Sequence, residues 1–192
     1  MRNFLLLLLS VSVLAGSCRF VVGKRVKGNG NMRTEERTQT GFKGVESYGS
    51  FDIFVSNGPQ TWVKIEAEEN LLPYIESYID GDILKIDTRD GYRLDPQRSV
   101  RIFVTAPDFR RIKSFGSGNI TGETKITGIE KLDLGVTGSA DIKMEVDAPE
   151  VVFARRVGDD AVAARLRGDG HIVGVLRGEE RPQRSRPGAA SA

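Results

Sequence analysis

Hydrophobic and polar residues alternate with a period of two along most of the chain after residue 34. This alternation predicts β-strands that bury one face, because successive side chains of a strand point to opposite sides. The clearest runs cover residues 63–68, 100–106 and 140–147. Their apolar positions are Val63, Ile65, Ala67, Val100, Ile102, Val104, Ala106, Ala140, Ile142, Met144 and Val146.

Turn signals fall between these runs. Asn57-Gly58, Asp80-Gly81 and Asp90-Gly91 are dipeptides that accept a positive backbone φ, and each separates or ends an apolar run. Only residues 68–75, EENLLPYI, indicate a helical turn, which Pro73 keeps short. Since no longer amphipathic helix is predicted, the pattern argues against α/β folds with nucleotide-binding crossovers.

A short unit recurs along the chain, as GSFDI at 49–53, GSGNI at 116–120 and GSADI at 138–142. The last two units begin 22 residues apart, a spacing that suits one coil of a β-solenoid. Glycine fits the corner of each coil, because a tight bend requires backbone angles that a Cβ resists. The sequence therefore predicts an all-β solenoid.

In each unit the Ile is predicted to point inward, whereas the Ser and the Asp or Asn point outward. Stacked coils would align the outward residues in a ladder that could face a ligand. This ladder consists of Ser50, Asp52, Ser117, Asn119, Ser139 and Asp141. Its carboxylates, Asp52 and Asp141, could bind Ca²⁺ or act as a glycosidase-type acid/base pair, and the simpler interpretation is a solvated strand face.

Residues 28–151 resemble an exported bacterial family named "putative autotransporter adhesin, head GIN domain", which is common in Bacteroidetes. The matching segments are GNGN at 28–31, TEERTQTGFKGVESYGSFDIFV at 34–55, VKIEAEENLLPYIES at 63–77, VTAPDF at 104–109, SFGSGNI at 114–120 and VTGSADIKMEVDAPEV at 136–151. The resemblance implies a right-handed single-stranded β-helix similar to pectin-lyase-type folds. It also implies that catalytic residues are absent and that the protein acts in cell adhesion.

The first residues are typical of a bacterial lipoprotein. Arg2 precedes an apolar run that is too short to span a bilayer, so residues 1–17 are predicted to be a signal peptide. Ala15, Gly16 and Ser17 before Cys18 resemble a lipobox, which predicts lipidation of Cys18. The alternative is a plain secretory signal with a cysteine near the cleavage point. Residues 18–33 are basic and glycine-rich, and predict a flexible tether that could contact anionic lipids.

The composition changes after the head GIN-like β-helical domain that is predicted for residues 34–150. Residues 151–192 contain eight Arg, seven Ala, six Gly and no Lys, and only GDGHI at 168–172 resembles the recurring unit. We expect an atypical, partly disordered tail that leaves the C-terminal coils incomplete and the solenoid end open. A shifted reading frame would explain this composition, and a divergent final coil with a basic tail is the alternative.

Charge and composition exclude several classes of function. The 28 Lys plus Arg and 26 Asp plus Glu give a net charge of +2, which provides no reason to expect nucleic acid as a partner. The single Cys and the single His, His171, exclude a disulfide scaffold, a Cys/His zinc site and most His-based catalysis. We therefore predict no catalytic residue, no cofactor and no metal centre.

The sparse aromatic residues offer another candidate surface. Trp62, Tyr48, Phe54, Tyr92 and Phe103 could form a platform for a glycan or a peptide if several share an exposed face. Packing in the core or along an edge is the alternative for most of them.

Three hypotheses follow for function. The leading one is a noncatalytic, envelope-anchored β-helical module for cell adhesion or envelope scaffolding, which binds a glycan or a protein. The second is a carbohydrate-binding or carbohydrate-active protein, and the third is an assembly subunit that associates with other copies through its open end or sheet edge. Arg19, rather than Asp, follows Cys18, which favours the outer membrane over the inner one and leaves a periplasmic or surface orientation open.

Overall fold

The structure is a computed structural model that describes residues 23–157, 160–167 and 172–176. These residues form strands and one short 3-10 helix, η1 (Leu72–Tyr74), which lies inside the helical turn predicted at 68–75. No helix in this part of the chain has the length and apolar character needed to cross a membrane. The strands are β1 (Lys24–Lys27), β2 (Met32–Arg37), β3 (Gly44–Gly49), β4 (Phe51–Asn57), β5 (Trp62–Glu68), β6 (Ile75–Asp80), β7 (Ile83–Thr88), β8 (Tyr92–Asp95), β9 (Val100–Ala106), β10 (Arg111–Gly116), β11 (Ile120–Gly122), β12 (Lys131–Gly138), β13 (Ile142–Val146), β14 (Glu150–Val157), β15 (Asp160–Arg167) and β16 (Ile172–Leu176).

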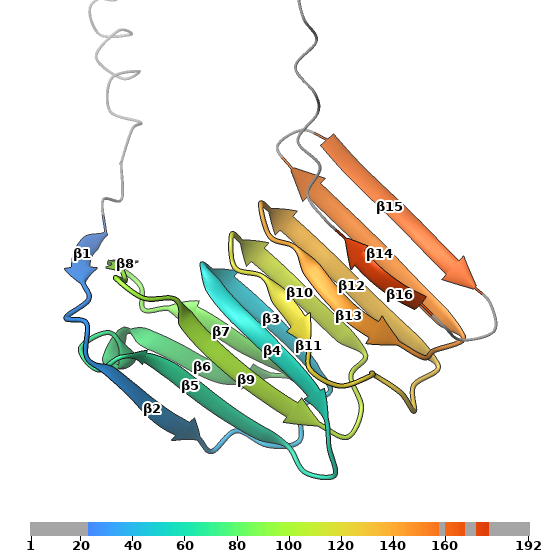
Figure 1. Cartoon of the computed structure of the whole chain (residues 1–192), viewed down its shortest axis with the longest axis horizontal. Helices are drawn as coiled ribbons and strands as arrows, with labels where there is room; N and C mark the ends of the chain where they lie inside the picture. Colours follow the sequence, from blue (N-terminus) through green and yellow to red (C-terminus); the bar gives the residue numbers. More distant parts are fainter. Residues whose placement is uncertain (1–22, 158–159, 168–171, 177–192) are drawn as a thin grey trace, which may run out of the picture.

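Two seven-stranded sheets lie one over the other (Figure 1). The first sheet has the order β15-β14-β12-β10-β3-β7-β6, and the second has the order β16-β13-β11-β4-β9-β5-β2. Strands β1 and β8 form a separate parallel pair beside the N-terminal end of the sheets (Figure 1). One apolar core fills the space between the two sheets.

The core follows from the alternation in the sequence. In β4, for example, Phe51, Ile53 and Val55 are buried between the sheets, while Asp52 and Phe54 point outward and are half-buried. The same pattern holds in β9, where Val100, Ile102, Val104 and Ala106 are buried. Burial of these apolar columns supplies the main driving force for the association of the two sheets.

The three Gly-Ser units lie side by side in parallel register. Each unit turns the chain from the first sheet into the second, at the corners β3–β4, β10–β11 and β12–β13. The corner glycines Gly49, Gly116 and Gly138 are aligned, and so are Ile53, Ile120 and Ile142. A side chain cannot replace the hydrogen of Gly138, because its φ is 123° and a Cβ would lie 2.2 Å from the carbonyl oxygen of Gly116.

The predicted right-handed single-stranded β-helix is wrong. In such a solenoid each coil pairs in parallel with the next coil along the chain, whereas both large sheets of this protein are mixed. After β4 the chain runs antiparallel into β5, forms the β6–β7 hairpin, and returns in β9 beside β4. Residues 54–115 therefore separate the first Gly-Ser unit from the second, and β10 pairs with β3 across this excursion.

The turn dipeptides explain this difference in fold. Gly81, with a φ of 64°, lies in the tight turn that reverses the chain between β6 and β7. Such a turn joins antiparallel strands, which a parallel solenoid does not contain. The turn predicted at Asp80-Gly81 is therefore the turn of an antiparallel hairpin.

The ends of the described chain also differ from the expectations. Part of the predicted tether, 18–33, forms β1, and β2 already begins at Met32. Past residue 150, β14 pairs in parallel with β12, while β15 and β16 pair antiparallel with β14 and β13. The sheets therefore extend into the predicted tail and beyond the open end expected near Val146. The predicted signal peptide and the segment after residue 176 lie outside the described residues.

Side chains from β2 and the segment after it cover one edge of the first sheet. Arg37 donates through Nη2 to the carbonyl oxygens of Leu72, at 3.4 Å, and Ile75, at 3.3 Å. Gln39 donates through Nε2 to the carbonyl oxygen of Ser77, at 2.8 Å. Two carbonyls of edge strand β6, those of Ile75 and Ser77, are thereby hydrogen-bonded without a neighbouring strand.

Candidate functional site

The predicted polar ladder gathers at the corners of the Gly-Ser units, where its three serines are exposed. Asp52 Oδ1 accepts a hydrogen bond from the backbone N–H of Asn119, at 3.1 Å. Asn119 Oδ1 accepts one from the backbone N–H of Asp141, at 3.0 Å. These side chains thus join neighbouring segments where the bend interrupts the strand pairing. The members of the ladder are Ser50, Asp52, Ser117, Asn119, Ser139 and Asp141.

The arrangement separates the two candidate Ca²⁺ ligands. Asn119 lies between Asp52 and Asp141: its backbone N–H donates to Asp52, and its side-chain oxygen accepts from the backbone N–H of Asp141. Within the described ranges, no group of three His, Cys, Asp or Glu side chains could hold a metal ion.

A second candidate surface lies on the outer face of β4, β9 and β5, and we call it the aromatic face. It is formed by Phe54, Phe103, Lys64 and Trp62. The rings of Phe54 and Phe103 stack with centroids 4.9 Å apart and an angle of 17° between their planes. The Lys64 ammonium lies 4.3 Å from the centroid of Phe103 and 5.5 Å from that of Trp62. Because β9 lies between β4 and β5, Phe54 and Lys64 cover opposite faces of the Phe103 ring.

Trp62 is the most accessible ring of the aromatic face, with 39% of its surface exposed. Further along β5, the Glu66 carboxylate holds two cations, Lys64 at 3.3 Å and Arg101 at 2.8 Å. The aromatic face therefore combines an exposed indole with charged groups whose positions are set by ion pairs. Such a surface can bind a partner through stacking and through directional polar contacts.

The outer face of the first sheet has a comparable stacked pair. Tyr48 and Phe115 lie 4.8 Å apart with an angle of 5° between their rings. The Tyr48 hydroxyl donates to Glu46 at 2.8 Å. Burial, together with this hydrogen bond and the nearby Glu46 charge, raises the pKa of Tyr48 to about 12.

An ion-pair network covers the strands next to this pair. Asp133 contacts Lys113 at 2.8 Å and Arg111 at 3.4 Å. Gly135 leaves space for the Lys113 side chain, because a Cβ at position 135 would lie only 3.1 Å from it. The cations and carboxylates are thus paired across strands, which indicates a structural role for this face.

The carboxylate of Glu68 organises the GNGN segment of the sequence. Glu68 is fully buried, and its oxygens accept hydrogen bonds from the backbone N–H groups of Gly30, at 2.5 Å, and Gln97, at 2.8 Å. Gly28 packs directly on this carboxylate, where a Cβ would clash. Glu68 therefore fastens the loop before β2 to the loop after β8 rather than offering a base to solvent.

Two cavities open at the N-terminal end of the sheets. One, of about 170 Å³, borders β8 and is lined mainly by apolar groups, including Phe51, Leu94 and Val100. The other, of about 420 Å³, lies between β2 and β6. The carboxylates of this second cavity, Glu35 and Glu76, form ion pairs with Arg37 and Arg89.

The structure brings Trp62, Phe54 and Phe103 together on one face, and places Tyr48 and Tyr92 elsewhere. Cys18 and His171 lie outside the described residues. The burial of Glu68 and the Tyr48–Phe115 stack are not predicted from the sequence. The triplets YGS at 48–50 and FGS at 115–117 carried the signal for the stack, because they place an aromatic residue at the same position of aligned units.

Comparison with known proteins agrees with the family resemblance seen in the sequence. A family model described as "Putative auto-transporter adhesin, head GIN domain" matches residues 41–159. No curated protein matches the chain.

Several solved structures share the fold. They include a "putative adhesin" from Parabacteroides distasonis, with 16% identity and a TM-score of 0.62 over 68% of this chain and 55% of that one. A "putative lipid binding protein" from the same species has 23% identity and a TM-score of 0.55 over 62% and 51% of the two chains. A "putative adhesin" from Bacteroides fragilis has 16% identity and a TM-score of 0.56 over 65% and 66%. The chain thus spans about half the length of the two Parabacteroides proteins.

Proposed function

The chain belongs to the putative auto-transporter adhesin, head GIN domain family, and from this membership we propose that it is an exported, noncatalytic binding module that acts in adhesion at the cell envelope. The family description supports an adhesion-type role and an exported or envelope-associated location. Within this proposal, adhesion to another surface is the main activity, and scaffolding of the envelope is its nearest variant.

The aromatic face is the observation that carries the proposal. It lies on a continuous sheet, so its side chains keep their relative positions when a partner binds. Trp62 offers exposed apolar surface, Lys64 lies beside it, and Arg101 adds a second cation further along the same sheet. Large aromatic residues together with cationic groups are enriched at the energetic centres of protein interfaces.

We further propose that a lipid on Cys18 anchors the mature protein, with the outer membrane as its location. The apolar run before Ala15-Gly16-Ser17-Cys18 supports this, as does the absence of an Asp directly after Cys18. Several acyl chains on one cysteine would hold the domain firmly, since each buried CH₂ contributes about 0.8 kcal/mol.

Carbohydrate binding is the second candidate function, and Trp62 is the observation that favours it. A sugar ring binds by stacking on the exposed face of an aromatic ring. Phe103 offers no such face, because Phe54 and Lys64 cover both sides of its ring. The indole of Trp62 is therefore the ring on the aromatic face that a glycan would use. A catalytic variant of this candidate is not favoured, because Asp52 is engaged with the backbone of Asn119.

Protease treatment of intact cells, followed by an adhesion assay, tests the proposal. We expect the domain to be cleaved on intact cells, and Trp62→Ala to lower adhesion several-fold without changing the melting temperature. Tyr78→Ala is the matched control, because Tyr78 is 46% exposed but lies on the opposite sheet. Full protection from protease, or equal loss of adhesion in both variants, would contradict the proposal.

A glycan array separates the two candidates. Binding that requires Trp62 supports the carbohydrate-binding function, whereas adhesion to protein-coated surfaces with no array signal supports a protein partner. Turnover of a glycan that disappears in Asp52→Asn or Asp141→Asn would overturn the noncatalytic assignment.

A further inference from the structure

We propose that the β1–β8 pair is a second binding surface, which docks on anionic phospholipid headgroups of the membrane that holds the chain. This inference rests on the proposed lipid anchor at Cys18. It concerns a different part of the molecule from the aromatic face.

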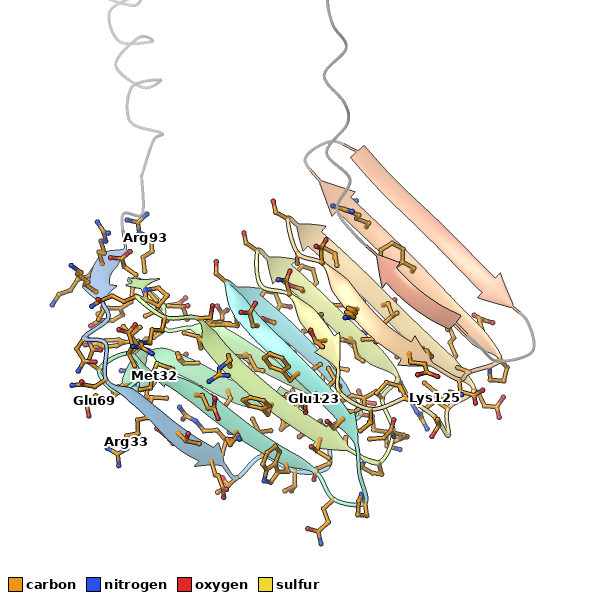
Figure 2. The ribbon with its side chains drawn as sticks, in the orientation of Figure 1. Met32, Arg33, Glu69, Arg93, Glu123 and Lys125 are labelled. Carbon is orange, nitrogen blue, oxygen red and sulfur yellow. The ribbon has the colours of Figure 1, made fainter. Side chains whose placement is uncertain are left out.

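The β1–β8 pair is part of the folded domain rather than a free linker. Lys24, Arg25, Val26 and Lys27 pair in parallel register with Tyr92, Arg93, Leu94 and Asp95. Leu94 packs against the main core, and its partner Val26 is half-buried. Because side chains alternate along a strand, Arg25 and Arg93 lie on the opposite face from this apolar pair. Figure 2 shows Arg93 at the outer corner of the molecule, beside β1.

The cations of the β1–β8 pair are largely unneutralised. Arg25 contacts Asp95 at 2.6 Å. Lys24, Lys27, Arg93 and Arg98 are exposed and have no ion-pair partner within the described part of the chain. Several basic side chains thus face solvent at one end, which is the charge pattern that an anionic lipid surface attracts.

The rest of the domain has the opposite charge. The other described residues, 28–91, 99–157, 160–167 and 172–176, together contain 21 acidic and 17 basic side chains. The body is therefore repelled by an anionic bilayer, while the β1–β8 end is attracted to it. This opposition favours one orientation, with the β1–β8 pair toward the lipid.

The length of chain before β1 places the pair within reach of the membrane. Five residue steps separate Cys18 from Gly23. Even when fully extended, they span at most about 18 Å. Electrostatic attraction to a bilayer decays over about 8 Å at physiological ionic strength, so a short connection is required for it to act. An acyl anchor combined with a basic patch is the two-signal arrangement that gives stable membrane attachment.

Vesicle sedimentation tests this inference without the anchor. The probe protein is the chain from residue 19 onward, which cannot be acylated at Cys18 and contains every described residue. Vesicles are pure phosphatidylcholine, or phosphatidylcholine with a third of the lipid replaced by phosphatidylglycerol. We expect sedimentation only with the second type, and a loss of binding in about 0.5 M NaCl.

The triple variant Lys24→Glu, Lys27→Glu and Arg93→Glu should bind phosphatidylglycerol vesicles at least about tenfold more weakly. The triple variant Arg110→Glu, Lys131→Glu and Lys143→Glu has the same net charge and alters exposed cations of the body, so it serves as the matched control. Circular dichroism shows whether the charge-reversed variant is folded. If it is not, Gln replaces Glu at positions 24, 27 and 93.

Three results would overturn the inference: equal binding to both vesicle types, equal loss in the control variant, or unchanged binding in the β1–β8 variant. The last result would assign the affinity to other cations, such as the arginines after residue 176. Incorporation of labelled palmitate, and its loss in Cys18→Ser, tests the anchor separately. Failure of the docking surface can therefore be distinguished from failure of the proposed anchor.

Discussion

The Oδ1 atom of Asp52 lies 3.1 Å from the backbone nitrogen of Asn119, which follows it by 67 positions in the chain. The contact recurs one segment further on, where Asn119 accepts from the backbone N–H of Asp141. Residues that were predicted to face a ligand thus also bind the corners of the sheets to one another. Their side-chain chemistry therefore contributes to stability, whether or not a ligand binds beside them.

Removal of the Asp52 acceptor should destabilise the domain. Asp52→Ala leaves the Asn119 N–H without its protein partner at a solvent-accessible corner, and we expect a loss of at most about 1 kcal/mol in the free energy of unfolding. Asp52→Asn retains a side-chain oxygen and should cost less. Urea unfolding measures both, with Ser117→Ala as an exposed control. If Asp52→Ala leaves the free energy of unfolding unchanged, the contact does not stabilise the fold.

The corner glycines should tolerate no side chain. In Gly138→Ala the new Cβ meets the carbonyl oxygen of Gly116 at a positive φ, so we expect a loss of more than about 2 kcal/mol. Gly128→Ala is the control, because Gly128 has a φ of 76° but open space around its Cβ position. That variant should lose about 1 kcal/mol, from backbone strain alone. Equal losses in thermal unfolding would refute the steric explanation.

Two buried serines that are neighbours in the first sheet should respond differently to the same substitution. Ser114 donates through Oγ to the carbonyl oxygen of Gly118, at 3.1 Å, whereas the buried Oγ of Ser47 has no hydrogen-bond partner. Ser114→Ala should therefore cost about 1 kcal/mol, and Ser47→Ala should be neutral or stabilising. Chemical denaturation of the two variants provides the comparison, and a reversed order would disprove this account.

Alkaline pH should destabilise the domain through Tyr48. The pKa of Tyr48 is raised to about 12 from an ordinary value near 10, so the folded protein holds this proton more tightly than the unfolded chain. The stabilisation is complete below about pH 10 and is lost as the pH rises toward about 12. Melting temperatures across this range should fall less in Tyr48→Phe than in the wild type. Tyr78→Phe, which alters an exposed tyrosine, should behave like the wild type.

Some of the architecture could be predicted from local pattern. The alternation at 63–68 and 100–106 identified strands and their buried faces, and Pro73 limited the helical turn. The sheet order could not be predicted in the same way, because pairing between residues 67 positions apart leaves no periodic trace in one sequence. The aromatic face depends on this pairing, since Phe54 and Phe103 come from distant segments. The burial of Glu68 could not be predicted, because a Glu beside another Glu is typical of an exposed position. The two backbone N–H groups that compensate its burial come from distant segments.

The contacts of Arg37 and Gln39 with β6 give this edge of the first sheet side-chain partners in place of a further strand. An incoming strand at β6 would find the carbonyls of Ile75 and Ser77 already engaged, and would have to displace a guanidinium and an amide to pair with them. Sheet edges whose backbone groups lack such partners are the templates on which β-rich proteins polymerise. Two copies of this chain that meet at this boundary are thus hindered from joining their sheets, and they remain separate molecules.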